Sequence, residues 1–175
     1  MLALVSRTGR HLQRYDEGRR QVVGCIPYRL KITSQTSLEA EEDLEVLVIS
    51  SQKGNRMSFP KGGWESDESI KEAALRECIE EAGVQGIVQC ELGKWRFKSR
   101  SKGTYNEGYM FPLLVNKQLD LWPEKDVRQR IWMSVRKARE VCQHEWMKEA
   151  LDEFVRRLGS KQQNQEEEVG TCSVS

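Results

Sequence analysis

Short apolar runs recur along the chain and predict buried strands. Two of them lie at 22–26 and 45–49. The second is rich in valine and isoleucine, as expected for a strand that is covered on both faces. Pro27 follows the first run and indicates that this strand ends at the edge of a sheet. The polar stretch 34–43 between the two runs predicts a surface loop. Further short strands are expected at 57–59, 109–115 and 131–133.

A helical pattern occupies the middle of the chain. Ser66 or Asp67 can cap its N-terminus, and Glu68 falls in the expected first turn, where the helix dipole favours a negative charge. Apolar residues three and four positions apart then form one stripe, as in a helix that packs on a sheet. Gly83 is a typical C-terminal stop, so the helix is expected to end there.

Strands and helices are mixed along the whole chain. Two further helices are expected at 134–142 and 145–158. The predicted fold class is therefore α/β, with a mixed β-sheet sandwiched between α-helices. A chain of 175 residues suits one main domain, predicted at 15–159. A basic arm at 1–14 precedes this domain, and a polar tail at 160–175, predicted to be disordered, follows it.

Composition narrows the classes of protein to which the chain can belong. The formal net charge of +1 provides no global positive field, so a nucleic-acid partner is not expected. No apolar run approaches the roughly 20 residues that span a bilayer, so no membrane association is expected either. The five cysteines are scattered without a C-x-x-C pair, which argues against a zinc site or a disulfide framework and suits a reducing compartment. The oligomeric state is left open.

The N-terminus bears on where the protein acts. The first fifteen residues contain Arg7, Arg10 and Arg14 and no acidic residue, which faintly resembles a mitochondrial transit peptide. They lack the serine-rich, amphipathic character of such peptides. We expect the cytoplasm and/or the nucleus, with mitochondrial targeting by the basic N-terminus as the alternative.

A basic stripe lies between Lys94 and Lys102. Basic residues alternate there with Trp95 and Phe97, so a strand would place the cations on one face and the aromatic rings on the other. The cations could face solvent, a phosphate groove or RNA. We favour a solvated face for the cations and a core position for both rings.

The central helix carries an unusual concentration of carboxylates. Glu77, Glu80 and Glu81 are separated by three and four positions, so they lie on one face of a helix. Like charges that close repel each other and lower helix stability. Hard oxygen ligands of this kind suit Mg²⁺ or Mn²⁺, which typically bridge carboxylates and substrate phosphates. The pattern therefore predicts a divalent cation at this helix.

The same stretch resembles a known sequence motif. From Gly62 to Val84 the chain reads Gly-x5-Glu-x7-Arg-Glu-U-x-Glu-Glu-x-Gly-U, where U is an aliphatic residue. This is the Nudix box, with Cys78 at the first aliphatic position. So many fixed positions make the motif far more specific than a lone glycine-rich loop. An acidic solvated helix face would leave the glycines and Arg76 unexplained.

The resemblance to the Nudix hydrolase family implies roles for individual residues. Glu77 and Glu81 are implied as metal ligands, together with the carbonyl of Lys61. Glu80 is implied as the general base that activates water, although in the family this position can also be a third ligand. Arg76 and Glu68 are implied as supporting catalytic residues of the same network. The reaction implied is metal-dependent attack of water on a phosphoanhydride.

The sequence around the box resembles one group within the family. The segments RYDEGRRQVVGCIPYR and VLVISSQKGNRMSFPKGG, and the later R-x-R-x-W, are most similar to plant relatives of the diphosphoinositol polyphosphate phosphohydrolases. This implies a small, highly anionic substrate, namely diphosphoinositol polyphosphates and/or dinucleoside polyphosphates. Cations and hydroxyls should line its pocket. The candidates are Arg19, Arg20, Ser50, Ser51, Lys53, Arg56 and Lys61.

Two alternatives stay open at this point. The chain could hydrolyse ADP-ribose, NADH or an RNA cap instead. It could also be a Nudix-fold binding module without catalysis. The intact glutamate cluster argues against the second alternative, because a retired site has no need for carboxylates that repel each other.

Overall fold

One large sheet organises the molecule. The computed structural model describes residues 5–31, 43–99, 101 and 103–171, with side chains through residue 161. In chain order the elements are β1 (Tyr15–Asp16), β2 (Arg19–Leu30), β3 (Leu44–Ser50), β4 (Met57–Ser58), β5 (Lys61–Gly63), α1 (Ile70–Glu77), the π-helical turn η1 (Cys78–Ala82), β6 (Val84–Val88), β7 (Gly93–Lys98), β8 (Tyr105–Gln118), β9 (Arg130–Ser134), α2 (Val135–Val141) and α3 (Glu145–Thr171). The predicted loop at 34–43 falls, apart from Asp43, outside the described residues.

Strand β2 lies at the centre of this sheet. It runs parallel to β8 and antiparallel to β3 and β5. Strands β4 and β9 extend the sheet beyond β3, and β6 and β7 both pair with β8. The sheet is therefore mixed, as predicted from the alternation of strands and helices.

The predicted end of β2 at Pro27 is wrong, because the strand continues to Leu30. On one flank, β2 pairs with β5 up to Gly24 and with β3 only from Tyr28 onward. The N–H of Cys25 points to this flank, where it donates to the carbonyl of Pro60 at 3.1 Å. With a period of two, the nitrogen of Pro27 points the same way, into the gap between the two partners. Proline is tolerated there because the ladder needs no donor.

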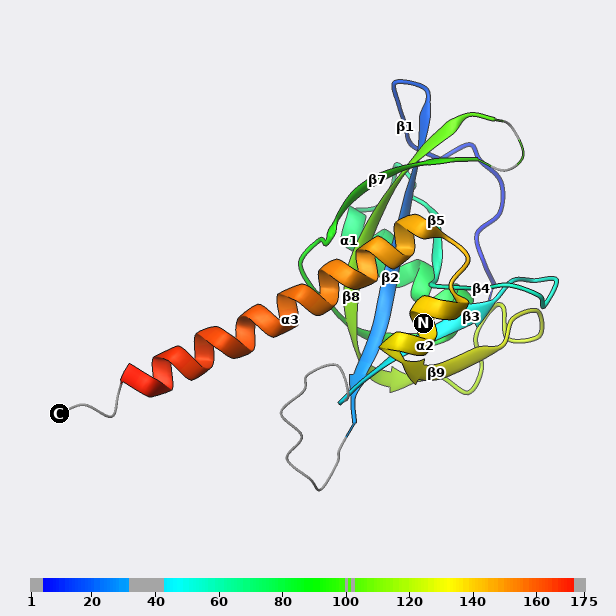
Figure 1. The fold of residues 1–175 in the computed structure, drawn as a ribbon. Helices are drawn as coiled ribbons and strands as arrows, with labels where there is room; N and C mark the ends of the chain where they lie inside the picture. Colours follow the sequence, from blue (N-terminus) through cyan, green and yellow to red (C-terminus); the bar gives the residue numbers. More distant parts are fainter. Residues whose placement is uncertain (1–4, 32–42, 100, 102, 172–175) are drawn as a thin grey trace.

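The two faces of the sheet carry separate apolar clusters. Along β3, Val46 and Val48 belong to the cluster that contains residues of α2 and α3, whereas Leu47 and Ile49 belong to a cluster that includes Cys78 and Ala82. Figure 1 shows α2 and α3 in front of the sheet and α1 behind it. The predicted sandwich of a mixed sheet between helices is thus confirmed.

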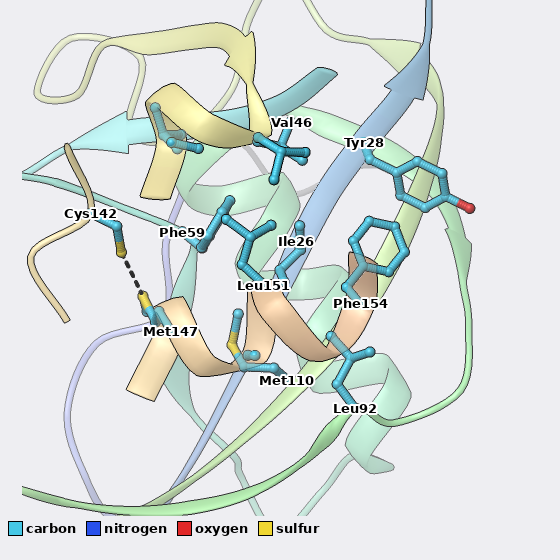
Figure 2. Close-up of a cluster of buried hydrophobic side chains, with 14 of the residues drawn as sticks. Ile26, Tyr28, Val46, Phe59, Leu92, Met110, Cys142, Met147, Leu151 and Phe154 are labelled. Atoms are coloured by element: carbon cyan, nitrogen blue, oxygen red, sulfur yellow. Dashed lines mark hydrogen bonds between the residues drawn. The ribbon is translucent and has the colours of Figure 1, made fainter. Parts of the chain in front are cut away.

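The larger cluster lies under α3. Figure 2 shows the ring of Phe154, from α3, beside that of Tyr28, from β2, and their centroids lie 4.8 Å apart. On β7, Phe97 stacks on Trp146 with a centroid distance of 4.7 Å, and Trp95 packs against the same cluster. The core position predicted for both β7 rings is therefore confirmed. The cations of the stripe on β7 are exposed, and Arg100 and Lys102 lie outside the described residues.

Two further expectations are corrected by the structure. Helix α3 does not end at Leu158 but continues through Gly159 to Thr171, so residues 160–171 of the predicted disordered tail are helical. Residues 160–171 contain three Gln and three Glu, which are good helix formers, and the one glycine among them costs only about 1 kcal/mol. Cys25 and Cys78 form a disulfide between β2 and η1. They are 53 positions apart, and only the packing of the helix on the sheet brings them together.

None of the helices in the described part of the chain combines the length and the apolar character that crossing a bilayer takes.

Candidate active site

The turn between β5 and α1 leads into the acidic helix. Helix α1 begins at Ile70, and the hydroxyl of Ser69 caps it by accepting a hydrogen bond from the N–H of Glu72. The start therefore lies after the predicted capping positions. Glu68 therefore precedes the helix. Its carboxylate accepts a hydrogen bond from the N–H of Glu65 at 3.1 Å and so shapes the turn.

The second half of the predicted helix is a π-helical turn. Helix α1 passes into η1 at Cys78, and η1 ends where Gly83 adopts a left-handed conformation with φ of 63°. The predicted stop at Gly83 is confirmed. Glu80 and Glu81 lie in this wider turn, a geometry that often marks functional sites. Together with Glu77 they face one cavity.

Arg76 contacts the acidic groups from several directions. Its Nη1 donates to Glu77 at 2.8 Å and to Glu80 at 3.4 Å. Its Nη2 donates to Glu68 at 2.7 Å and to the carbonyl of Gly63 at 2.9 Å. A planar guanidinium that makes all these bonds holds each carboxylate in one orientation. Arg76 and Glu68 thus belong to one network with Glu80, and their catalytic roles remain predictions.

Glu81 is held by residues from two other parts of the chain. One of its oxygens accepts the backbone N–H of Lys61 at 3.1 Å. The other accepts a hydrogen bond from Arg128 at 3.3 Å. Arg128 also donates to Glu124 at 3.0 Å and to the carbonyl of Ser50 at 3.0 Å. No separate role was predicted for Arg128, although it is the first arginine of the R-x-R-x-W segment.

The charges of this site are poorly solvated. Burial raises the pKa of Glu77, Glu80 and Glu81, and for Glu77 the charge of Glu81 adds to the effect while Arg76 opposes it. Burial also lowers the pKa of the Lys61 amino group. The raised pKa values of the carboxylates and the lowered pKa of the amino group have the same cause, because burial makes the ionised form of each group less favourable. A cation bound among the carboxylates would offset this cost.

The donor groups fit a divalent cation chemically. Carboxylate oxygens are ligands that Mg²⁺ and Mn²⁺ prefer. Gly62 leaves the room that Glu77 uses, because a Cβ at Gly62 would lie 2.1 Å from its Oε1. Among the described residues, no three acidic, histidine or cysteine side chains converge on one point as a ligand set. Arginines and backbone N–H groups bond to the carboxylate oxygens instead, so the ligand assignment of Glu77, Glu81 and the Lys61 carbonyl remains a prediction.

A cavity of about 380 Å³ lies over the carboxylates. Of the predicted substrate residues, Arg20 and Lys61 line it, and Arg20 is oriented by a 2.8 Å bond from its Nε to Gln13. Arg76 and Arg128 line it as well. The cavity therefore combines acidic groups for a cation with basic groups for an anion.

The other predicted substrate residues lie elsewhere. Arg19 points to the opposite face of β2, where its Nε lies 3.4 Å from Glu107. The hydroxyl of Ser50 is buried and accepts the N–H of Gln129 at 2.9 Å. The turn between β3 and β4 carries three more that are not part of the cavity lining: Ser51, Lys53 and Arg56.

Several residues of the cavity have no signal in the sequence. Residues 6–9 of the basic arm line it, and so do Gln13, Gln52 and Glu124. Glu124 lies in the segment between β8 and β9, far along the chain from the acidic helix. No local periodicity connects such distant positions, so only the tertiary structure brings them into the site.

Known proteins are similar to this chain in sequence and in fold. Residues 37–158 match the family model described as NUDIX domain. Nudix hydrolase 17, mitochondrial, of Arabidopsis thaliana is 61% identical over 175 residues, which cover 100% of this chain and 94% of that protein. Diphosphoinositol polyphosphate phosphohydrolase 3-alpha of Mus musculus is 33% identical over 132 residues, or 74% of this chain and 73% of that one. A crystal structure of a C. elegans Ap4A hydrolase binary complex has the same fold, with a TM-score of 0.59 and 20% identity over 80% of this chain and 98% of that chain. The chain therefore belongs to the Nudix hydrolase family, whose members hydrolyse pyrophosphate-containing substrates and generally need a divalent metal.

Proposed function

We propose that the protein hydrolyses a phosphoanhydride bond in a small, highly phosphorylated substrate, with Mg²⁺ or Mn²⁺ as its cofactor. The observation that carries this proposal is one cavity lined by both kinds of charge. The carboxylates of Glu77, Glu80 and Glu81 face the same space as the cations of Arg20 and Arg128. Such a pairing suits a metal ion on one side and phosphate groups on the other.

In this proposal each residue has a separate task. Glu77, Glu81 and the carbonyl of Lys61 would hold the metal, which would supply a lowered pKa of water and neutralise phosphate charge. Arg76 keeps the carboxylates of Glu77 and Glu80 oriented, through the bonds at 2.8 and 3.4 Å. The basic side chains of Arg20, Lys61 and Arg128 bind phosphate oxygens through charge-assisted hydrogen bonds.

Glu80 acts as the general base of the reaction. A water oxygen attacks phosphorus while one proton of that water passes to the Glu80 carboxylate. The bridging P–O bond breaks, and its electron pair leaves with the departing phosphate. Burial raises the pKa of Glu80, which makes it a better proton acceptor than an ordinary carboxylate.

The substrates that we propose are diphosphoinositol polyphosphates and/or dinucleoside polyphosphates. The 33% identity to a mouse protein named as a diphosphoinositol polyphosphate phosphohydrolase supports the first class. Basic residues around the cavity are compatible with both classes, because each carries several phosphates. Hydrolysis of ADP-ribose, NADH or an RNA cap is the second candidate.

A substrate panel tests this proposal most directly. Initial rates should be measured with Mg²⁺ and with Mn²⁺ on diphosphoinositol pentakisphosphate, diadenosine tetraphosphate, ADP-ribose, NADH and capped RNA. We expect the highest kcat/KM for one of the first two. A higher value for any of the others would contradict the proposed substrate class while leaving the hydrolase assignment intact.

Substitution of the carboxylates tests the chemistry. We expect Glu80→Gln and Glu81→Gln each to lower kcat by at least about a hundredfold, because each loses a base or a ligand while keeping its volume. Exposed Glu72 on the same helix provides the matched control, and Glu72→Gln should retain full activity. Full activity of both test variants would refute the roles given to Glu80 and Glu81. Absence of hydrolysis by the wild type would instead favour the binding-module alternative.

The compartment belongs to the proposal as well. The Arabidopsis relative carries the word mitochondrial in its name, which favours mitochondria over the cytoplasm or the nucleus for this chain. Imaging of a C-terminal fluorescent fusion with compartment markers would test this. Exclusion of the fusion from mitochondria would contradict it.

A further inference from the structure

Part of the basic arm crosses the cavity in which the carboxylates lie. We call residues 6–9 the strap, because all four of them line that cavity. The strap has no regular secondary structure, and it ends at Gly9, whose φ of +85° turns the chain. Nothing in the local sequence predicted this position. The proposed function gives the strap no task.

Side-chain bonds fix the strap on both sides of the cavity. On one side the hydroxyl of Ser6 donates to Glu124 at 3.2 Å. On the other side the guanidinium of Arg7 bonds Asp67 at 2.9 and 3.0 Å and also pairs with the buried carboxylate of Glu65. Charge-assisted bonds of this kind are about twice as strong as neutral ones. Arg7 is therefore the principal anchor of the strap.

Between these anchors the strap contacts Glu80 directly. The backbone N–H of Arg7 donates to one carboxylate oxygen of Glu80 at 3.2 Å. Arg76 donates to the other oxygen at 3.4 Å. Each oxygen thus has a donor from a different part of the chain. The two bonds together set both the direction and the tilt of the carboxylate plane.

We propose that Arg7 is a positioning residue for hydrolysis, acting through the strap on Glu80. This inference rests on the proposed function, in which Glu80 serves as the general base. A base must lie within about 3 Å of the proton that it accepts, and small misplacements cost large factors in rate. Loss of the Arg7 side chain would release the strap and with it the N–H that orients Glu80.

Kinetics of the full-length chain with Mn²⁺ test this inference, with diadenosine tetraphosphate and diphosphoinositol pentakisphosphate as the probes. We expect Arg7→Ala, and deletion of residues 2–9, to lower kcat by about tenfold or more while KM changes less than about threefold. Arg7→Lys should recover part of kcat, because an ammonium can still pair with Glu65 or Asp67. Arg10→Ala removes an exposed cation of the same arm outside the cavity lining and should leave kcat within about twofold of the wild type.

A double-mutant cycle separates the anchor from a general loss of stability. Asp67→Asn alone should lower kcat less than Arg7→Ala, since Glu65 still holds the guanidinium. The double variant should resemble Arg7→Ala, because Asp67 acts only through Arg7. Thermal unfolding of every variant accompanies the kinetics, and Arg7→Ala should unfold within a few degrees of the wild type.

The outcomes distinguish this inference from the proposed function. Glu80→Gln serves as the reference. If Glu80→Gln is inactive while Arg7→Ala keeps the kcat of the wild type, the inference is overturned and the proposed function stands. A higher kcat/KM after deletion of residues 2–9 would also overturn it, because the strap would then obstruct the site. An effect of Arg7→Ala confined to KM would make Arg7 a substrate contact instead. Absence of hydrolysis of both probes by the wild type would overturn the proposed function and the inference together.

Discussion

At the level of single residues, Gly62 leaves the space that the Glu77 carboxylate fills. A Cβ at Gly62 would lie 2.1 to 2.4 Å from the carboxyl group, which is far inside van der Waals contact. The glycine is needed for this approach and not for an unusual φ, since Gly62 is not among the positive-φ glycines. Its place in the motif therefore has a steric cause that concerns the site itself.

This predicts that Gly62→Ala displaces Glu77. We expect kcat/KM to fall by about a hundredfold, since displacement of a reacting group by about 1 Å costs that much. The free energy of unfolding should change by only about 1 to 3 kcal/mol, as for other overpacked positions. Steady-state kinetics and denaturant unfolding measure the two effects. Gly159→Ala, in a helix with open space around it, is the matched control and should keep full activity.

At the level of elements, alternation along a strand decides which side chains reach the cavity. Arg19 and Arg20 are neighbours on β2, so they point to opposite faces of the sheet. Arg20 lines the cavity, and Arg19 contacts Glu107 on the other side. The strand predicted from the sequence began only at residue 22, so both arginines stood as substrate candidates. Which of the two reaches the cavity depends on where α1 and η1 pack.

The junction of β2, β7 and β8 predicts a pH dependence of stability. Glu107 is 2% exposed, and it accepts a hydrogen bond from Gln21 at 3.0 Å and pairs with Lys94 at 3.1 Å. The hydrogen bond from Gln21, together with Lys94 and Arg19, lowers the pKa of Glu107 to about 2. An unfolded glutamate has a pKa of about 4.3, so this contribution is fully present above that pH and disappears as the pH falls toward 2.

We therefore expect Glu107→Gln to lower the free energy of unfolding by about 1 to 3 kcal/mol at pH 6. The difference from the wild type should shrink steadily between pH 5 and about pH 3, because the wild-type carboxylate then loses its advantage. Urea unfolding at a series of pH values measures it. Glu149→Gln, an exposed position on α3, should show no such trend. A difference that stays constant with pH would contradict the role given to the charge of Glu107.

At the level of the whole molecule, the site is assembled from distant segments. The acidic helix, β5, the segment before β9 and the basic arm all contribute to one cavity. Burial raises the pKa of the carboxylates packed in it, and for Glu77 the charge of Glu81 adds to the effect, so the ionised groups oppose folding when no cation is bound. Metal binding and global stability should therefore be coupled.

The coupling predicts a thermal shift. Saturating Mn²⁺, at about a hundred times its Kd, should add about 2.7 kcal/mol to the free energy of unfolding. For a chain of this length, that raises the Tm by about 5 to 10 °C.

Glu77→Gln and Glu81→Gln should abolish the shift and, without metal, should be at least as stable as the wild type because the repulsion is relieved. Glu72→Gln should keep the shift. Chelation with EDTA should reverse it and stop hydrolysis, and a full shift in both test variants would refute the ligand assignment.

The sequence by itself determined the elements whose periodicity is local. The central parts of the longer strands, the stop at Gly83 and the carboxylates on one helical face follow from short-range patterns, which any single segment carries. Helix α3 extends past its predicted end, because the polar residues 160–171 include many good helix formers. Only the tertiary structure decided that Arg128, Glu124 and the strap share the cavity and that Arg19 does not. These positions come together through sheet pairing and packing between segments far apart in the chain, and no short-range pattern records such contacts.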